Sequence, residues 1–102
     1  MFSQEEKIKL MKSLMWDYNI PPEHCLEVLE GSREMAGHYN EDTLFRKLLE
    51  SFPWFTILEL LPLSRIFFLL KEKTVHSLRS KSLTLKYEFV RTRLQKIVSA
   101  AG

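Results

Sequence analysis

The residues whose side chains could do chemistry are few in this sequence. Its one cysteine, Cys25, directly follows His24, and the remaining histidines, His38 and His76, lie far away along the chain. A cysteine with a histidine is the pairing that nucleophilic catalysis uses, and both residue types also bind zinc. Adjacent side chains diverge on a helix, however, and a lone cysteine in an apolar helical pattern is typically a small core residue. We therefore predict no metal, no cofactor and no enzymatic activity.

Glutamates offer the alternative chemistry of a general acid paired with a general base. Four of them recur at helical spacing, which is typical of a solvated helix flank: Glu23, Glu27, Glu30 and Glu34. A catalytic pair would need one carboxylate in an apolar pocket. Only Glu59 lies in the most apolar stretch of the chain, where an unpaired charge is costly. We expect Arg65 or another base to pair with it, or the side chain to reach the surface, and we favour the ion pair.

The composition bounds the fold and the compartment. The chain has 102 residues, of which 45% are hydrophobic and 27% charged, with three glycines and four prolines. This profile is typical of one compact domain, so we treat residues 1–102 as a single domain. A lone cysteine forms no internal disulfide, and the acidic N-terminus does not resemble a signal peptide. We expect a cytoplasmic protein.

Charge is distributed unevenly along the chain. The first 64 residues carry six bases and eleven acids, whereas residues 65–102 carry nine bases and two acids. The net charge of +2 therefore hides an acidic first part and a basic second part. The basic part could attract an anionic partner. Its charges could equally be neutralised inside the fold or across a homodimer.

The order of apolar residues and helix-ending residues predicts an all-α fold. Helical periodicity covers the ranges 4–18, 23–30, 41–52, 53–61, 63–72 and 82–99, and Thr74 could cap a further turn. Ser3 with Glu6 forms a capping box, Gly31 closes the second range, and Asn40 caps the third. No stretch of strand length alternates apolar and polar residues. We predict a compact bundle of five or six short helices.

The apolar stretch 52–70 raises the question of a membrane span. Pro53 and Pro62 divide it into short pieces, and Glu59 and Arg65 would each cost about 2.5–3.5 kcal/mol at a bilayer centre. We therefore expect two short helices that are buried as the centre of the domain, and no membrane contact.

The last predicted helix has two different faces. One carries a regular apolar stripe that we expect to face the core: Leu83, Tyr87, Val90, Leu94, Ile97 and Val98. The other face combines apolar and basic side chains: Leu85, Lys86, Phe89, Arg93 and Lys96. Such a face fits a protein partner, a nucleic acid whose phosphates it follows, or simply burial of Leu85 and Phe89 under neighbouring helices.

Trp16 is the other candidate for a partner site. It lies opposite the apolar arc of the first predicted helix, immediately before Asp17. Either it packs against the turn formed by residues 20–22, or it is an exposed anchor for another molecule.

A few short motifs spread over most of the chain carry a resemblance. They are Leu14-Met15-Trp16-Asp17, Gly37-His38, Leu48-Leu49-Glu50 with Trp54, and Tyr87 before Leu94. In these the chain resembles small bacterial helical proteins of unknown function, some of which are similar to accessory or antitoxin-like partners of nucleotidyltransferase toxins. The resemblance implies partner binding and brings no known catalytic residue.

The sequence therefore predicts a protein-interaction or regulatory module, with a homodimer as one possible form. Trp16, Leu85 and Phe89 would be the apolar anchors, and Arg91, Arg93 and Lys96 would supply charge complementarity. The alternative is a nucleic-acid-binding accessory protein that uses the basic C-terminal helix.

Overall fold

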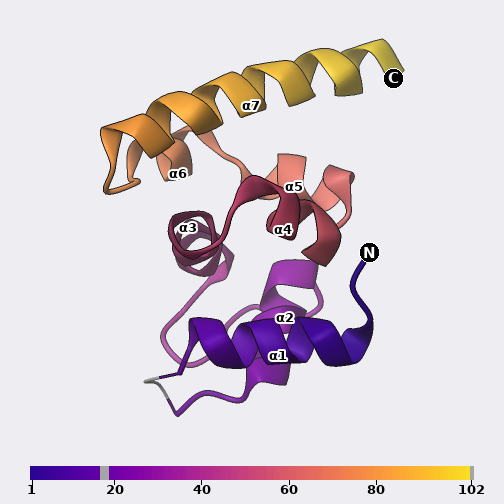
Figure 1. Ribbon diagram of the computed structural model, residues 1–102, viewed down its shortest axis with the longest axis vertical. Helices are drawn as coiled ribbons and strands as arrows, with labels where there is room; N and C mark the ends of the chain where they lie inside the picture. The colour runs from indigo at the N-terminus through magenta and orange to yellow at the C-terminus, as the bar shows by residue number, and fades with distance from the viewer. Residues whose placement is uncertain (17–18, 102) are drawn as a thin grey trace.

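The computed structural model describes residues 1–16 and 19–101, with side chains up to Ser99, and these ranges contain seven α-helices. In chain order the helices are α1 (Gln4–Leu14), α2 (Pro22–Glu30), α3 (Glu41–Ser51), α4 (Trp54–Leu60), α5 (Leu63–Leu69), α6 (Glu72–His76) and α7 (Lys81–Ala101). Figure 1 shows α1 and α2 at one end of the molecule, α3, α4 and α5 in the middle, and α7 across the other end. The all-α prediction is confirmed, but the number of helices was underestimated.

Helix α3 is the centre of the bundle, since it contacts α1, α2, α4, α5 and α6. Its four large apolar side chains are buried almost completely: Leu44, Phe45, Leu48 and Leu49. The helix starts at the predicted cap, where the Thr43 amide donates to the Asn40 side chain at 2.9 Å and the Asn40 amide donates back to Thr43 Oγ1 at 3.0 Å. The radius of gyration, 13.3 Å, is close to the value of about 13 Å expected for a folded domain of this length.

Helices α1 and α2 also begin and end mostly where local signals predict. The Ser3–Glu6 capping box is present at the start of α1, and Gly31 ends α2 with a left-handed φ of 93°. Helix α1 stops at Leu14, short of the predicted residue 18, because the backbone leaves the helical region at Met15 although that side chain is still buried. The rest of the predicted range includes Tyr18, which lies outside the described residues.

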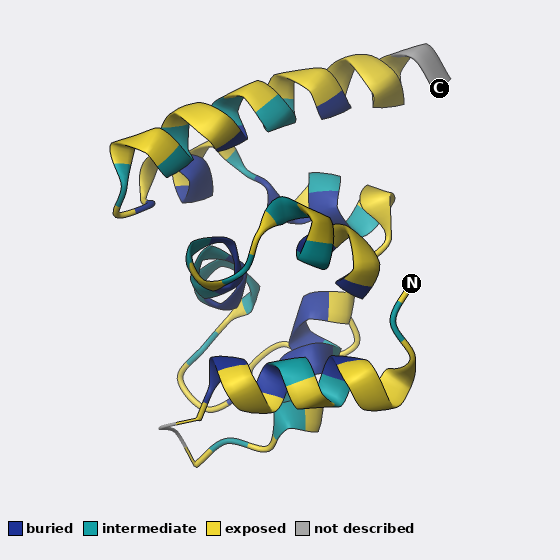
Figure 2. Ribbon diagram, in the orientation of Figure 1, coloured by how far each residue is buried: buried dark blue, intermediate teal, exposed yellow. Residues whose placement is uncertain are grey.

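The apolar stretch forms two short helices separated by Leu61 and Pro62, as predicted. Each helix buries one side only, so the expectation that the whole stretch is buried is wrong. Figure 2 shows exposed residues on these helices, and the exposed apolar ones are Phe55, Leu58, Leu63 and Phe68. Within the described part of the chain, no helix has the length and apolar character needed to cross a membrane.

Helix α6 lies where the sequence predicted the end of a helix over 63–72 and a further turn after Thr74, so the bounds of both predictions are wrong. Helix α5 ends at Leu69, and the Lys71 amide donates to the Leu69 carbonyl at 2.9 Å, with Leu70 at φ −83° and ψ 67° between them. These are the dihedral angles of an inverse γ-turn. The helix that follows begins after Lys71, so Thr74 is a buried residue inside α6 and not its cap.

The bend at Lys71 brings its ammonium group to the start of α3. Lys71 Nζ lies 3.0 Å from Asp42 Oδ1 and 3.6 Å from Glu41 Oε1, and Lys73 Nζ lies 3.1 Å from Asp42 Oδ2. Burial alone would raise the pKa of Asp42, but hydrogen bonds from the two lysines outweigh it and lower the pKa. These contacts across more than twenty residues of chain explain why a local pattern does not reveal the bend.

Glu59 reaches the surface and forms its ion pair with another base, not with Arg65. Glu59 is exposed, and its Oε2 lies 2.8 Å from the amino group of Met1. Arg65 instead donates to the Leu29 carbonyl at 2.7 Å, to the Val28 carbonyl at 3.2 Å and to Glu41 Oε2 at 2.8 Å. Arg65 therefore satisfies carbonyls at the end of α2 and joins that helix to α3 and α5.

Candidate functional site

Helix α7 is held on the bundle along its first two thirds, from Leu83 to Leu94. Tyr87 and Leu94 are buried and Leu83 and Val90 are half-buried, as the apolar stripe predicts. The Tyr87 ring meets Trp54 of α4 edge to face, with the ring centroids 6.1 Å apart. The Thr84 hydroxyl lies 3.2 Å from the Ser80 carbonyl and 3.3 Å from the Val75 carbonyl of α6, and it can donate to either.

The predicted core stripe of α7 extends too far toward the C-terminus. Ile97 and Val98 were expected in the core, but both are exposed. Figure 1 shows the reason, because the C-terminal turns of α7 extend beyond the helices beneath them. Periodicity tells which side of a helix is apolar, but it does not tell how far the neighbouring helices reach.

The Tyr87 hydroxyl is the one orphaned polar group of this contact. It is completely buried, and none of the described residues forms a hydrogen bond with it. Burial raises the pKa of Tyr87, because the ionised phenolate would lose its hydration. The packing of α7 on α4 therefore depends on the apolar ring and is opposed by the hydroxyl.

The outer side of α7 presents the two apolar residues singled out in the sequence. Leu85 is 58% exposed and Phe89 65% exposed, so the interpretation that they pack under neighbouring helices is wrong. Lys86, Arg93 and Lys96 are exposed around them, and the Arg93 guanidinium carbon lies 5.8 Å from the centroid of the Phe89 ring. We name these five residues, Leu85, Lys86, Phe89, Arg93 and Lys96, the α7 face.

The bases before α7 differ from those on α7, which are Lys81, Lys86, Arg91, Arg93 and Lys96. Those before α7 pair with acids of α3: Arg65 with Glu41, Lys71 with Glu41 and Asp42, Lys73 with Asp42, and Arg79 with Glu50. By contrast, none of the carboxylates in the described ranges lies within ion-pair distance of a base on α7, and three of these bases, Lys86, Arg93 and Lys96, belong to the α7 face. The suggestion that the fold neutralises its basic part therefore holds for α5 and α6 and fails for the α7 face.

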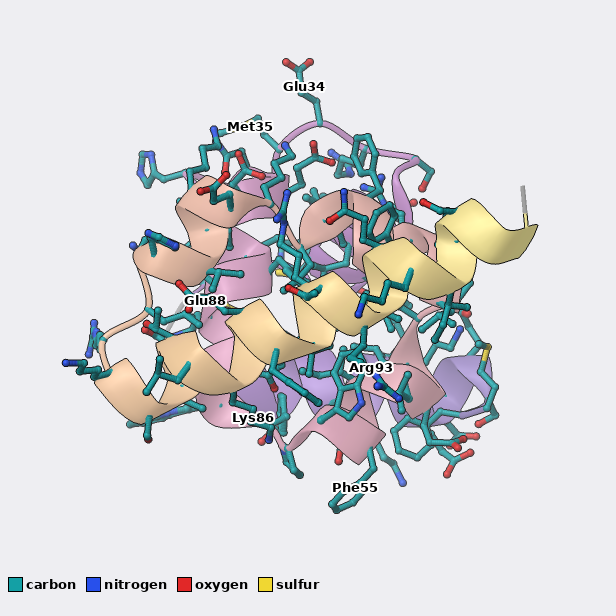
Figure 3. The ribbon with its side chains drawn as sticks, turned by 90° about the horizontal axis from the view of Figure 1, so that it is seen from above. Glu34, Met35, Phe55, Lys86, Glu88 and Arg93 are labelled. Carbon is teal, nitrogen blue, oxygen red and sulfur yellow. The ribbon has the colours of Figure 1, made fainter. Side chains whose placement is uncertain are left out.

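One flank of α7 is basic and the other carries an acid. Figure 3 looks down on α7 and shows Lys86 and Arg93 on the same side as Phe55 of α4, with Glu88 on the opposite side. Glu88 Oε1 lies 2.9 Å from His76 Nε2. Phe55 is 70% exposed, and sequence reasoning missed it because it lies in a stretch that reads as uniformly apolar.

The structure does not bring Trp16 or Arg91 to the α7 face. Trp16 is 82% exposed, so the expected packing against the proline turn is absent. It follows α1, which lies at the end of the molecule opposite α7 (Figure 1). Arg91 is half-buried on the flank of Glu88, where both side chains line a cavity with His76. Trp16 is therefore a separate exposed side chain and Arg91 belongs to the other flank.

The residues considered for catalysis do not assemble. Cys25 is buried, and burial raises the pKa of its thiol, which disfavours the nucleophilic thiolate. Across residues 1–16 and 19–101, no three histidine, cysteine, aspartate or glutamate side chains gather into a metal-binding group. The cavity of about 570 Å³ beside Gly31 is lined by Arg65, whose guanidinium already binds the carbonyls of α2 and Glu41. Arg65 and Glu41 in this cavity therefore hold helices together.

Comparison with protein-family models, with curated proteins and with solved structures finds no match to this chain. The likeness to small bacterial accessory proteins therefore stays a prediction, and the argument for function rests on the residues of the α7 face.

Proposed function

We propose that this protein is an interaction module that docks another protein on the α7 face. The observation that carries the proposal is the exposure of Leu85 and Phe89 side by side on one rigid helix, among bases that have no acidic partner in the described structure. Exposed apolar anchors with arginine nearby are typical of interface hot spots. A regulatory or antitoxin-like role, in which the bound protein is held in one state, would follow from such docking.

The contacts of the α7 face also support a binding role. Leu85 and Phe89 contribute little to the core, and Lys86, Arg93 and Lys96 have no carboxylate partner in the described structure. The Arg93 guanidinium contacts the Phe89 ring in the unbound protein. Because this contact already restricts both side chains, less conformational entropy is lost when a partner binds.

Nucleic-acid binding is the second candidate, and the unpaired charges of Lys86, Arg93 and Lys96 favour it. The two candidates differ in their response to salt. Phosphate contacts release counterions, so binding falls steeply as salt rises, whereas apolar docking is much less sensitive.

The experiment is affinity capture with the tagged protein from a lysate of the source organism, at low and high salt and with and without nuclease. We expect a protein that survives nuclease and high salt and is lost with the double variant Phe89→Ala, Arg93→Ala. The matched control is Gln95→Ala, which changes an exposed residue on the Glu88 flank of the same helix. Recovery of nucleic acid that salt removes would contradict the proposal and favour the second candidate.

A further inference from the structure

We propose that the partner of the α7 face is an acidic amphipathic helix of another protein. Its apolar side chains would lie on Leu85 and Phe89, and its carboxylates would approach Lys86, Arg93 and Lys96. This inference rests on the proposed function, because it names the chemistry of the partner for the same face.

The shape of the α7 face fits a helix. Leu85, Phe89 and Lys96 follow one another along a single line of α7 at helical spacing. At a rise of about 1.5 Å per residue, this line is about 16 Å long, which is three helical turns. A straight ridge of this kind packs against a second helix, whose apolar residues recur at three- and four-residue spacing.

The charge of the α7 face selects an acidic partner. Lys86 and Arg93 lie on one flank with Phe55 nearby on the same side of the molecule (Figure 3). Glu88, on the other flank, is the acid closest to the face along the helix, and it is held by His76. Carboxylates on the partner would therefore meet Lys86 and Arg93 on the Phe55 side, whereas on the other side the charge of Arg91 is offset by Glu88, so the attraction is stronger on the Phe55 side.

A second copy of this chain fits the face less well. A two-fold axis through the α7 face would set Lys86, Arg93 and Lys96 of one copy against the same bases of the other. Exposed acids such as Glu5 and Glu23 lie on α1 and α2, at the opposite end of the molecule from α7 (Figure 1). A contact between that end and the α7 face of another copy would be head-to-tail and would continue into open chains.

A nucleic acid would contact only some residues of the α7 face. Single strands bind by stacking bases on aromatic rings and by placing phosphates on bases such as lysine and arginine. The Arg93 guanidinium already lies over the Phe89 ring, and Leu85 offers neither a charge nor an aromatic surface. An acidic amphipathic helix uses both the apolar and the basic residues.

The test titrates the full chain with two labelled synthetic helical peptides that share one apolar stripe, and it follows binding by fluorescence anisotropy. The acidic peptide has glutamate on one side of the stripe and glutamine on the other, and the neutral peptide has glutamine on both sides. We expect the acidic peptide to bind at least about tenfold more tightly at low salt, and Phe89→Ala to weaken its binding about tenfold or more. The variant Lys86→Gln, Arg93→Gln should remove the preference for the acidic peptide, while Gln95→Ala should keep it.

Each other outcome overturns a defined part of the account. Equal binding of the two peptides overturns the acidic partner but leaves apolar docking, and with it the proposed function. Binding of neither peptide overturns the acidic helix, and affinity capture then decides separately whether a protein docks at all. Binding of a single-stranded oligonucleotide in place of the peptides contradicts both proposals. A dimer in light scattering that Phe89→Ala dissociates assigns the face to a second copy.

Discussion

Removing the hydroxyl group of Tyr87 should stabilise the protein. The side chain is fully buried, its ring packs edge to face on Trp54, and its hydroxyl has no hydrogen-bond partner among the described residues. A buried polar group left without a partner costs about 1–3 kcal/mol. Tyr87→Phe keeps the ring and its contact with Trp54, and it removes this cost.

The magnitude follows from the size of the domain. A stability change of about 1 kcal/mol moves the melting temperature of a domain of this size by about 4–8 °C, so Tyr87→Phe should raise the melting temperature by at least about 4 °C. Tyr87→Ala, which also removes the ring from the core, should have a free energy of unfolding about 3–5 kcal/mol below that of Tyr87→Phe. Thermal unfolding followed by circular dichroism, with urea unfolding as a check on the slope, measures both changes.

The same residue predicts a difference at alkaline pH. Burial raises the pKa of Tyr87 in the folded state, so above about pH 10 the unfolded chain loses this proton first and stability falls as the pH rises. Tyr87→Phe should therefore lose less stability than the wild type between neutral and alkaline pH. A Phe variant less stable than the wild type by about 1 kcal/mol or more would refute the reasoning, because the hydroxyl would then make a stabilising hydrogen bond.

Three further substitutions or measurements test how the bundle is held together. Gly31→Ala should destabilise the protein by about 1–2 kcal/mol in urea unfolding, because φ is 93° and the new Cβ would lie 3.1 Å from the Arg65 guanidinium carbon; an unchanged midpoint would contradict this. The lowered pKa of Asp42 gives stability that is present above about pH 4 and is lost as the pH falls through the folded-state pKa. Asp42→Asn should therefore lose less stability than the wild type between neutral and acidic pH in urea unfolding. Equal losses in the two proteins would contradict the ion pairs of Asp42 with Lys71 and Lys73. Iodoacetamide should label Cys25 only in denaturant, since the thiol is buried and its pKa is raised, and rapid labelling of the native protein would show that the site is open.

Local sequence signals predicted the parts of the fold that local interactions decide. The capping box of Ser3 and Glu6, the cap at Asn40 and the glycine at residue 31 each act within a few residues, so their residue types are enough to predict them. The separation of α7 into an apolar side and a basic side also follows from spacing alone. The α7 face could therefore be described from the sequence, although its exposure could not.

Other features depend on contacts between distant segments and were missed for that reason. The bend at Lys71 is held by Asp42 of α3, far away along the chain, and it creates α6. Ile97 and Phe55 have the residue types of a core, and only the extent of the neighbouring helices leaves them exposed. A pattern of apolar residues predicts what can be buried, whereas tertiary packing decides what is buried.

The two tryptophans of the chain test docking on the α7 face most directly, because one lies close to α7 and the other far from it. Trp54 contacts Tyr87 beneath α7, and Trp16 is exposed at the opposite end of the molecule. The measurement is a two-dimensional ¹⁵N NMR titration of the protein with the acidic peptide, in which the two indole signals are assigned by substitution. The account predicts that the Trp54 indole and the amides of α7 shift while the Trp16 indole stays in place. A shift of the Trp16 indole without a change at Trp54 and α7 would contradict docking on the α7 face.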